Sequence, residues 1–260
     1  MSVPHQHTSP LSSARKTQLL DEEQARIEMA ALFRLAAREG LHEGISNHFS
    51  YALSEDGQRF LMNPYGIHFS QIKASDLLVF DAGDEVDTSD PRIDITAWSI
   101  HGAMHRNNPA ARCLVHLHPH YATALLSLEN PDLPAIDQTS ARFYNRLAWD
   151  SGFDGMGIGE EGERLSRLLG NHNVLMMGQH GILTAASSPA LAWDITYHLE
   201  RACKNYITAL SANRPLAHLN DDIAEKTARQ WQDYDEQVGY QQHLDAMMAV
   251  LDSEDASYRL

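Results

Sequence analysis

The sequence has few cysteines, few basic residues and no long apolar run. Its 260 residues include two cysteines, Cys113 and Cys203, which are too few for a zinc site of the CxxC type or for a disulfide framework. This cysteine usage is typical of a reducing compartment, so we expect a cytoplasmic protein. No stretch reaches the roughly 18 apolar residues of a membrane-spanning helix, and the N-terminal residues lack the apolar segment of a secretory signal.

The shortage of basic residues disfavours two classes of partner. Lysine and arginine number 20 against 35 aspartate and glutamate, which gives a formal net charge of −15. A chain this acidic repels phosphate backbones and anionic lipid surfaces. We therefore expect a small-molecule substrate, and neither a nucleic-acid nor a membrane partner.

Histidine, by contrast, is abundant, with 15 residues in the chain. It is the commonest metal ligand and the usual general acid or base near neutral pH. Two of the histidines lie in residues 1–16, a segment rich in serine, proline and histidine that we expect to be a flexible tail. Such a tail does not orient a metal ligand, so the informative histidines are those inside regular elements.

Hydrophobic periodicity and turn residues predict one α/β domain over residues 17–260, including a C-terminal helical extension. Apolar residues at helical spacing predict helices at 17–39, 94–107, 119–128, 160–169, 188–211 and 221–251. Short apolar runs between turns predict strands at 48–53, 59–63, 76–81 and 112–118, and two more within 173–185. Strict alternation of strand and helix is absent, which favours a mostly antiparallel sheet with helices packed on it. A doubly wound parallel sheet is the second choice.

The strongest chemical signal is the pair His116 and His118 in the run Val115–Pro119. Side chains two residues apart on a strand point to the same face, so these imidazoles can hold adjacent positions of one metal ion. The alternative is a polar pair on a solvated face, but the apolar residues before them indicate an interior strand, where unpartnered imidazoles are costly.

A third histidine, His180, stands between Gly178–Gln179 and Gly181 at the junction of the last two predicted strands. Glycine allows close backbone approach, so His180 can lie against a neighbour without a clash. A hairpin turn that contains a histidine by chance is the alternative. Taken together, the three histidines predict a metal centre with open positions for water or substrate.

Weaker signals surround two turns and one helix. Ser46, Asn47 and Ser50 could bind an anion through hydroxyl and backbone N–H groups, although ordinary turns explain them equally well. Candidate proton-transfer groups are His48, His101, Tyr144 and Asp94. Each also has a structural reading: Asp94 as a helix cap, for example, and Tyr144 as a packing residue.

These motifs resemble the class II aldolase/adducin family over about residues 22–215. The resemblance depends on the N-terminal helix, on Ser46-Asn47-x-x-Ser50 in place of the family's phosphate loop, on the H-x-H strand followed by Pro-x-Tyr-Ala-Thr-Ala, and on the later His-Gly. It implies a three-layer α/β/α fold with a central, mostly antiparallel sheet. It also implies a divalent ion (zinc, manganese or iron) held by His116, His118 and His180, and a homotetramer.

The sequence departs from the aldolase pattern at position 97. The aldolases of the family carry a metal-site glutamate nineteen residues before the first histidine of H-x-H, where this chain has Ala97. The two phosphate-binding serines before it correspond to Ile95 and Thr96, which leaves Thr96 as a substrate-binding candidate. The resemblance is therefore closest to the adducin-like branch, whose members include decarboxylases of aromatic acids and iron-dependent oxygenases.

The function predicted from these residues is that of a metal-dependent lyase. Its substrate would be a small hydroxy- or keto-carboxylate or an aromatic acid, decarboxylated or cleaved through a metal-stabilised enolate. Two alternatives remain open: a mononuclear non-haem iron oxygenase with the same three histidines, and a non-catalytic adducin-like binding protein.

Overall fold

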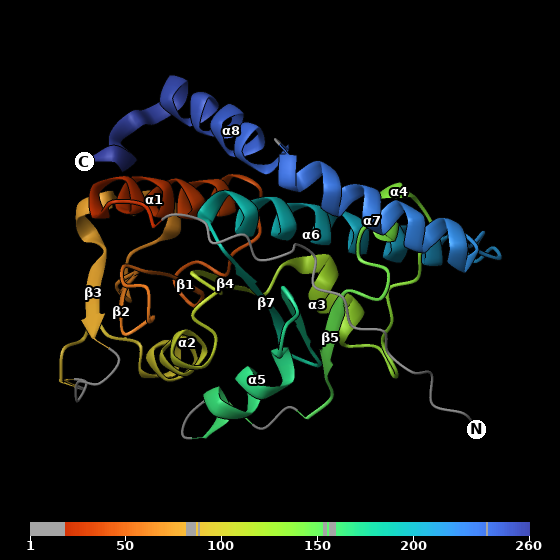
Figure 1. Ribbon diagram of the computed structural model, residues 1–260, viewed down its shortest axis with the longest axis horizontal. Helices are drawn as coiled ribbons and strands as arrows, with labels where there is room; N and C mark the ends of the chain where they lie inside the picture. Colours follow the sequence, from red (N-terminus) through yellow and green to blue (C-terminus); the bar gives the residue numbers. More distant parts are fainter. Residues whose placement is uncertain (1–18, 82–86, 88, 153–154, 156–159, 238) are drawn as a thin grey trace.

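The structure is a computed structural model that describes residues 19–81, 87, 89–152, 155, 160–237 and 239–260. The tail expected at 1–16 lies outside the described residues. Helices cover both faces of a central sheet, which gives three layers (Figure 1).

The sheet has seven strands in the order β3-β2-β1-β4-β7-β6-β5. Their bounds are β1 His48–Ala52, β2 Arg59–Met62, β3 Leu78–Asp81, β4 Cys113–Leu117, β5 Leu147–Asp150, β6 Val174–Met177 and β7 Gly181–Ala186. All neighbouring pairs are antiparallel except β5 and β6, which pair in parallel. The expected α/β fold with a mostly antiparallel sheet is confirmed, and the doubly wound parallel alternative is wrong.

Strand β5 is a strand that the periodicity did not predict. It spans four residues in a region with prolines and glycines on both sides, so it offers no alternation long enough to recognise. Its parallel pairing with β6 makes the sheet mixed.

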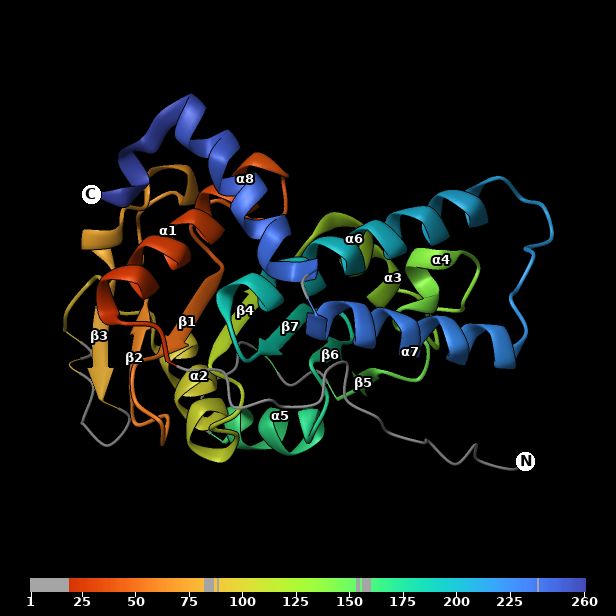
Figure 2. The ribbon, with the colours of Figure 1, turned by 45° about the horizontal axis from the view of Figure 1, so that its top comes forward.

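The helices divide between the two faces of the sheet (Figures 1 and 2). The larger core lies between the sheet and α1 (Glu22–Arg38), α3 (His120–Leu126), α6 (Pro189–Ser211) and α8 (Gly239–Asp255). A second apolar cluster lies between the other face and the pair α2 (Ile95–Asn107) and α5 (Glu161–Leu169). The short α4 (Gln138–Ala141) packs between α6 and α7 (Asp221–Gln237).

The single helix expected at 221–251 is two helices in the structure. Helix α7 ends at Gln237 and α8 begins at Gly239. A side chain at Gly239 would lie 2.6 Å from the Tyr234 ring, so glycine is needed where α8 turns away from α7. The periodicity continued across this break because both helices have an apolar face.

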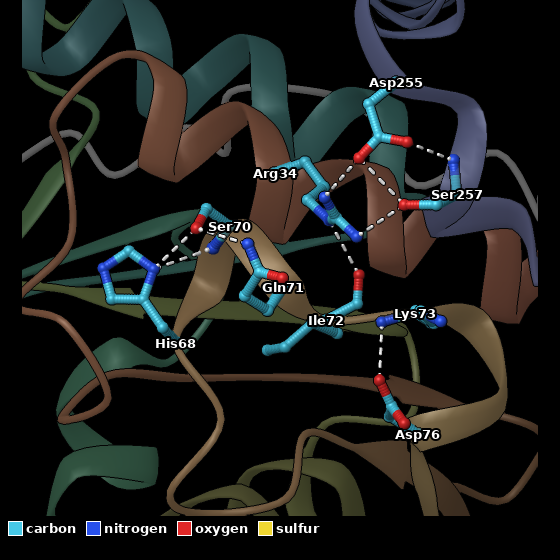
Figure 3. Close-up of polar contacts among 9 residues, drawn as sticks. All are labelled: Arg34, His68, Ser70, Gln71, Ile72, Lys73, Asp76, Asp255 and Ser257. Atoms are coloured by element: carbon cyan, nitrogen blue, oxygen red, sulfur yellow. Dashed lines mark hydrogen bonds and ion pairs between the residues drawn. The ribbon is translucent and has the colours of Figure 1, made fainter.

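The C-terminal end of the chain is tied to the first helix (Figure 3). Arg34 of α1 donates from Nε to the carbonyl oxygen of Ile72 at 2.9 Å and from Nη2 to the hydroxyl of Ser257 at 3.2 Å, and pairs with Asp255 at 3.3 Å. Ser257 belongs to the final turn, η3 (Ala256–Arg259), in which Tyr258 is fully buried. One arginine thus joins α1, the segment after η1 (Phe69–Gln71) and the C-terminus.

Each helix within the described ranges is too short or too polar to cross a bilayer.

Candidate metal centre

Strand β4 positions the first two histidines. His116 is the next-to-last residue of β4, and His118 directly follows the strand. Their rings meet edge to face with centroids 4.8 Å apart. His116 is 2% exposed because β1 and β7 flank it on either side. The period of two along the strand therefore places both imidazoles on one side, as the spacing predicts.

Hydrogen bonds to the outer nitrogens fix how these two rings are protonated. His116 Nδ1 lies 2.9 Å from the carbonyl oxygen of Ile182, and His118 Nδ1 lies 2.6 Å from the carboxylate of Glu43. Both partners are acceptors, so both Nδ1 atoms carry hydrogen. The two Nε2 atoms then turn toward each other, 3.0 Å apart.

This arrangement is unfavourable unless something positive lies between the two nitrogens. Burial lowers the pKa of His116 well below its ordinary value, so this ring is neutral and its Nε2 bears a lone pair. A second lone pair at 3.0 Å repels it, whereas a cation or a proton shared between Nε2 of His116 and Nε2 of His118 removes the repulsion. The donor set therefore fits a divalent ion that accepts imidazole.

His180 completes the group from the turn between β6 and β7. Its ring centroid lies 4.8 Å from those of His116 and His118, and one ligand atom from each of the three residues lies within 4.8 Å of the others. The following Gly181 makes this approach possible, because a Cβ there would lie 2.5 Å from both the His118 ring and the Leu117 carbonyl oxygen. The glycine next to His180 thus has the role that the sequence suggested.

A cavity of about 340 Å³ opens beside the three histidines. Its other walls come from the turn before β1, from α2 and from the β6–β7 turn. The lining residues are Ser46, His48, Thr96, Ile100, His116, His118, Gly155, Gln179 and His180. The space suits a small molecule that reaches the metal ligands from one side.

A chain of buried hydrogen bonds leads from this cavity into the layer between the sheet and α2. His48 Nδ1 lies 2.7 Å from His101 Nε2, and His101 Nδ1 lies 2.5 Å from the Ser50 hydroxyl. The same hydroxyl lies 2.7 Å from His105 Nε2. His101 and His105 are one helical turn apart on α2 and meet His48 and Ser50, which are two residues apart on β1.

Burial keeps these imidazoles neutral. It lowers the pKa of His48 and of His180 to about 4 and that of His105 to about 3, and it lowers that of His101 well below its ordinary value. Neutral imidazoles can bind a metal or pass a proton along a hydrogen-bonded chain without adding charge to the interior.

The structure brings some of the remaining candidates to the cavity and places others elsewhere. Ser46 and Thr96 line it. Asn47 is buried behind the wall, with its side-chain oxygen accepting from the backbone N–H of Glu43, while Ser50 belongs to the histidine chain. Their role in substrate binding stays a prediction.

Tyr144 and Asp94 lie outside the cavity. Tyr144 is not among the described residues that line it; it packs near Ala141 and Leu219, and burial together with the nearby Asp221 of α7 raises the pKa of its hydroxyl. Its catalytic role stays a prediction, for which this chain alone offers no contact with the histidines. Asp94 caps α2 by accepting from the backbone N–H groups of Thr96 and Ala97.

Position 97 does not face the cavity. Ala97 is 1% exposed and packs against Phe60 and Met62 in an apolar cluster, while Thr96 and Ile100 form the part of α2 that lines the cavity. None of the cavity-lining residues that the structure describes on α2 carries a carboxylate. The part of α2 that lines the cavity therefore carries no carboxylate, and the negative charge next to it is that of the capping residue Asp94, which opposes the lowering of the His48 pKa by burial.

Sequence reasoning missed two residues of this neighbourhood. Glu43 lies 75 positions from its partner His118, and no local pattern connects them. His105 had a detectable signal, since it follows His101 by one helical turn, but the meaning of that signal depends on the strand that faces α2.

Comparison with known proteins agrees with this fold. The profile of the Class II Aldolase and Adducin N-terminal domain matches residues 27–207. The chain belongs to the class II aldolase/adducin family, as the motifs predict.

Similar proteins carry several kinds of name. A Caulobacter vibrioides protein named for the class 2 aldolases is 33% identical over 210 residues, which cover 80% of this chain and 81% of that protein. The crystal structure of an aldolase II superfamily protein from Pseudomonas syringae has a TM-score of 0.84 and 29% identity, and covers 96% of this chain and 100% of that one.

Two further relatives bear names of specific reactions. Decarboxylase NovR of Streptomyces niveus is 28% identical over 206 residues, covering 77% of this chain and 75% of that protein. A 4-hydroxy-3-prenylphenylpyruvate oxygenase/4-hydroxy-3-prenylbenzoate synthase of Streptomyces roseochromogenus subsp. oscitans is 28% identical over 188 residues, with coverage of 70% and 67%.

Proposed function

We propose that this protein is a metal-dependent lyase that decarboxylates a small hydroxy- or keto-carboxylate or an aromatic acid, with aldol cleavage as the related reaction. The observation that carries the proposal is the approach of the His116 and His118 Nε2 atoms to 3.0 Å beside His180 and an accessible cavity. When bound by these three imidazoles, a zinc, manganese or iron ion supplies a Lewis acid that stabilises an enolate.

The cavity suits a compact acid. Ser46 and Thr96 offer hydroxyl groups on its wall, and Ile100 offers an apolar surface. These groups would hold the body of the substrate while its carboxylate or hydroxyl lies toward the three histidines. The Ser46 hydroxyl can donate a hydrogen bond to negative charge that develops on an oxygen of the substrate, whereas the Thr96 hydroxyl donates its hydrogen to Asp94 Oδ1 at 2.7 Å and can only accept.

The absence of a cavity-facing carboxylate on α2 favours decarboxylation over aldol cleavage. Aldol cleavage begins with removal of a hydroxyl proton by a base. Decarboxylation begins with loss of carbon dioxide and requires only a proton donor afterwards. His48 lines the cavity and is held by its hydrogen bond to His101, so its cavity-facing nitrogen can give a proton to the product carbon and recover one from water that enters the cavity when the product leaves.

Metal content and product formation test this proposal. We expect the purified protein to contain one equivalent of metal at this centre and to release carbon dioxide from at least one member of a panel of hydroxy, keto and aromatic acids. His116→Ala is expected to abolish both. Full metal occupancy at this centre in His116→Ala would contradict the proposal, and His218→Gln, at an exposed position, serves as the control.

The second candidate is a mononuclear iron oxygenase, favoured by the name of the related oxygenase from Streptomyces roseochromogenus. Three imidazole ligands leave positions free on a six-coordinate ion. Oxygen uptake that depends on iron and on an acid substrate would select this candidate, whereas carbon dioxide release without oxygen selects the lyase. For either reaction we propose a homotetramer, to be measured by sedimentation.

A further inference from the structure

A second group of metal-ligating side chains lies away from the cavity, between the two long helices that cover the sheet. Asp194 and His198 are one turn apart on α6, and His243 stands on α8. One ligand atom from each of the three lies within 4.8 Å of the others. This cluster shares no residue with the candidate metal centre.

One nitrogen of each imidazole lies near the same carboxylate oxygen of Asp194. Asp194 Oδ1 lies 2.6 Å from His243 Nδ1 and 3.3 Å from His198 Nδ1. The other oxygen, Oδ2, accepts from Arg142 Nη2 at 2.6 Å. A carboxylate held in this way by an outer partner keeps its free oxygen directed at the two imidazoles, as the outer partners of metal-ligating carboxylates do.

The charges around the cluster do not balance. Arg142 also donates from Nη2 to Asp235 of α7 at 2.7 Å, and all three of these charged residues are at least nine-tenths buried. Two carboxylates therefore face one guanidinium, and among the described residues the remaining negative charge is met only by the imidazoles of His198 and His243 at Asp194 Oδ1. A buried charge is costly unless it is paired, and a divalent ion between Oδ1 and the two imidazole nitrogens would supply that pairing.

The cluster is also accessible. The side chains of His198 and His243 are 22% and 23% exposed, while Asp194 is 6% exposed. An ion can therefore enter from the imidazole side without displacing the buried pair of Arg142 and Asp194. Aromatic rings border the site, with Trp231 5.9 Å from His198 and Tyr197 5.1 Å from His243 between ring centroids.

We propose that Asp194, His198 and His243 form a second binding site for a divalent ion of the zinc class, which joins α8 to α6. Imidazole and carboxylate ligands select zinc, cobalt or nickel over magnesium and calcium. Each imidazole would bind through Nδ1 and carry its hydrogen on Nε2, so neutral rings would lose no proton. His198 would exchange its 2.8 Å hydrogen bond from Nδ1 to the Asp194 backbone carbonyl oxygen for the ion. The ion links two helices that already share buried contacts at Leu244 and Met248.

Equilibrium dialysis of the chelator-treated, full-length protein against zinc, followed by elemental analysis, tests the site. We expect two equivalents in the wild type and one in the double variant His118→Ala/His180→Ala. We likewise expect one in His198→Gln/His243→Gln, because glutamine keeps a hydrogen-bond donor for Asp194 but is a poor zinc ligand. The control His218→Gln should bind as the wild type does.

Thermal unfolding supplies an independent readout. Zinc should raise the unfolding midpoint of His118→Ala/His180→Ala, and this rise should disappear when His198→Gln/His243→Gln is added. A midpoint that responds to pH but not to zinc in the His118/His180 variant would show that protonated imidazoles alone balance the charge, and would overturn the proposal.

The same measurements separate this site from the proposed function. No binding at all by His198→Gln/His243→Gln would contradict the centre at His116, His118 and His180 and leave the second site standing. No change in stoichiometry in that variant would contradict the second site alone. If a variant does not fold, the number of metal equivalents bound by the wild type tests the proposal. A single equivalent contradicts one of the two sites, and cobalt absorption of the wild type shows which ligands hold that ion.

Discussion

At the scale of single residues, the carboxylate of Glu43 supplies the candidate metal centre with its outer negative charge. Glu43 lies 2.6 Å from His118 Nδ1, on the side of the ring that faces away from the other histidines. A carboxylate in this position fixes the ring orientation and makes the opposite nitrogen a stronger ligand. A carboxylate, that of Glu43, thus belongs to the site. It comes from the loop before β1 and contacts His118, one of the proposed metal ligands.

We expect Glu43→Gln to weaken metal binding by about 10- to 100-fold, because glutamine cannot polarise the imidazole as a carboxylate does. Competition with a chromophoric chelator measures the affinity. Glu55→Gln, at an exposed position on the β1–β2 turn, is the matched control. Equal affinities of Glu43→Gln and wild type would mean that Glu43 does not act on the metal ligands.

Gly181 is the second residue on which the centre depends. We expect Gly181→Ala to lower both metal affinity and the free energy of unfolding, because the added methyl would lie 2.5 Å from the His118 ring and the Leu117 carbonyl oxygen. Forced contacts in a packed interior cost about 1–3 kcal/mol. Denaturant unfolding measures the loss, with Gly102→Ala of α2 as a control, since a Cβ there meets only the end of the flexible Arg106 side chain, at 3.3 Å. A Gly181→Ala variant as stable as Gly102→Ala would contradict this explanation.

At the scale of elements, the antiparallel register of β1 and β4 assembles the histidines. His48 pairs directly with His116 across the two strands, and α2 packs on the same side with His101 and His105. Four imidazoles and one hydroxyl therefore share a buried layer, in which His48 and His116 border the cavity and His101, His105 and Ser50 lie behind them. The four imidazoles are neutral because they are buried together in this layer.

This layer predicts a loss of stability in acid. Histidines with an ordinary pKa of 6.5 take up protons in the unfolded chain as the pH falls below that value, whereas burial lowers the folded-state pKa of His48 to about 4 and of His105 to about 3. The unfolded state therefore binds more protons between these values, and each such histidine lowers the free energy of unfolding by up to about 1.4 kcal/mol per pH unit.

Three carboxyl groups oppose this trend. Burial raises the pKa of Asp235 to about 6 and raises those of Glu28 and Glu200 above their ordinary value, so their protonation favours the folded state as the pH falls toward the ordinary carboxyl values. The histidines of the unfolded chain take up protons at a higher pH, and we expect the denaturant midpoint of the chelator-treated protein to fall between pH 7 and pH 5. His105→Gln should reduce the slope and His218→Gln should not; a midpoint that is constant or rises in acid would show that burial does not keep these imidazoles neutral.

At the scale of the whole molecule, the C-terminal helices close the larger core. Leu244, Met248 and Leu251 of α8 are buried against α1 and α6, and Tyr258 beyond them is fully buried and donates to Asp252 at 2.8 Å. The contacts of Arg34 with Ser257 and Asp255 add polar ties between the two ends of the described chain (Figure 3).

We expect Tyr258→Ala to lower the free energy of unfolding by about 3–5 kcal/mol, because it removes a large buried ring. Tyr65→Ala, at a position that is 45% exposed, should change it little. Chemical denaturation compares the two variants. Similar stabilities would indicate that the C-terminal turn can detach from α1 without loss.

Much of the fold could be predicted because its helices and strands are locally patterned. The alternation around His116 and His118 defined their strand, and the apolar spacing of α1, α2 and α6 defined those helices. Strand β5 and the break before Gly239 escaped prediction, since both depend on partners elsewhere: β5 on its parallel pairing with β6, and Gly239 on the Tyr234 ring.

The sequence by itself determined the family, the mostly antiparallel α/β fold and the three histidines to examine, because short motifs and local periodicity carry that information. Only the tertiary structure decided which other residues accompany them. Glu43, Ser50 and His105 reach the centre or its buried chain, and His243 reaches Asp194, through contacts between elements far apart in the chain. Hydrogen bonds depend on distances of about 3 Å, and such distances are set by packing and not by spacing along the sequence.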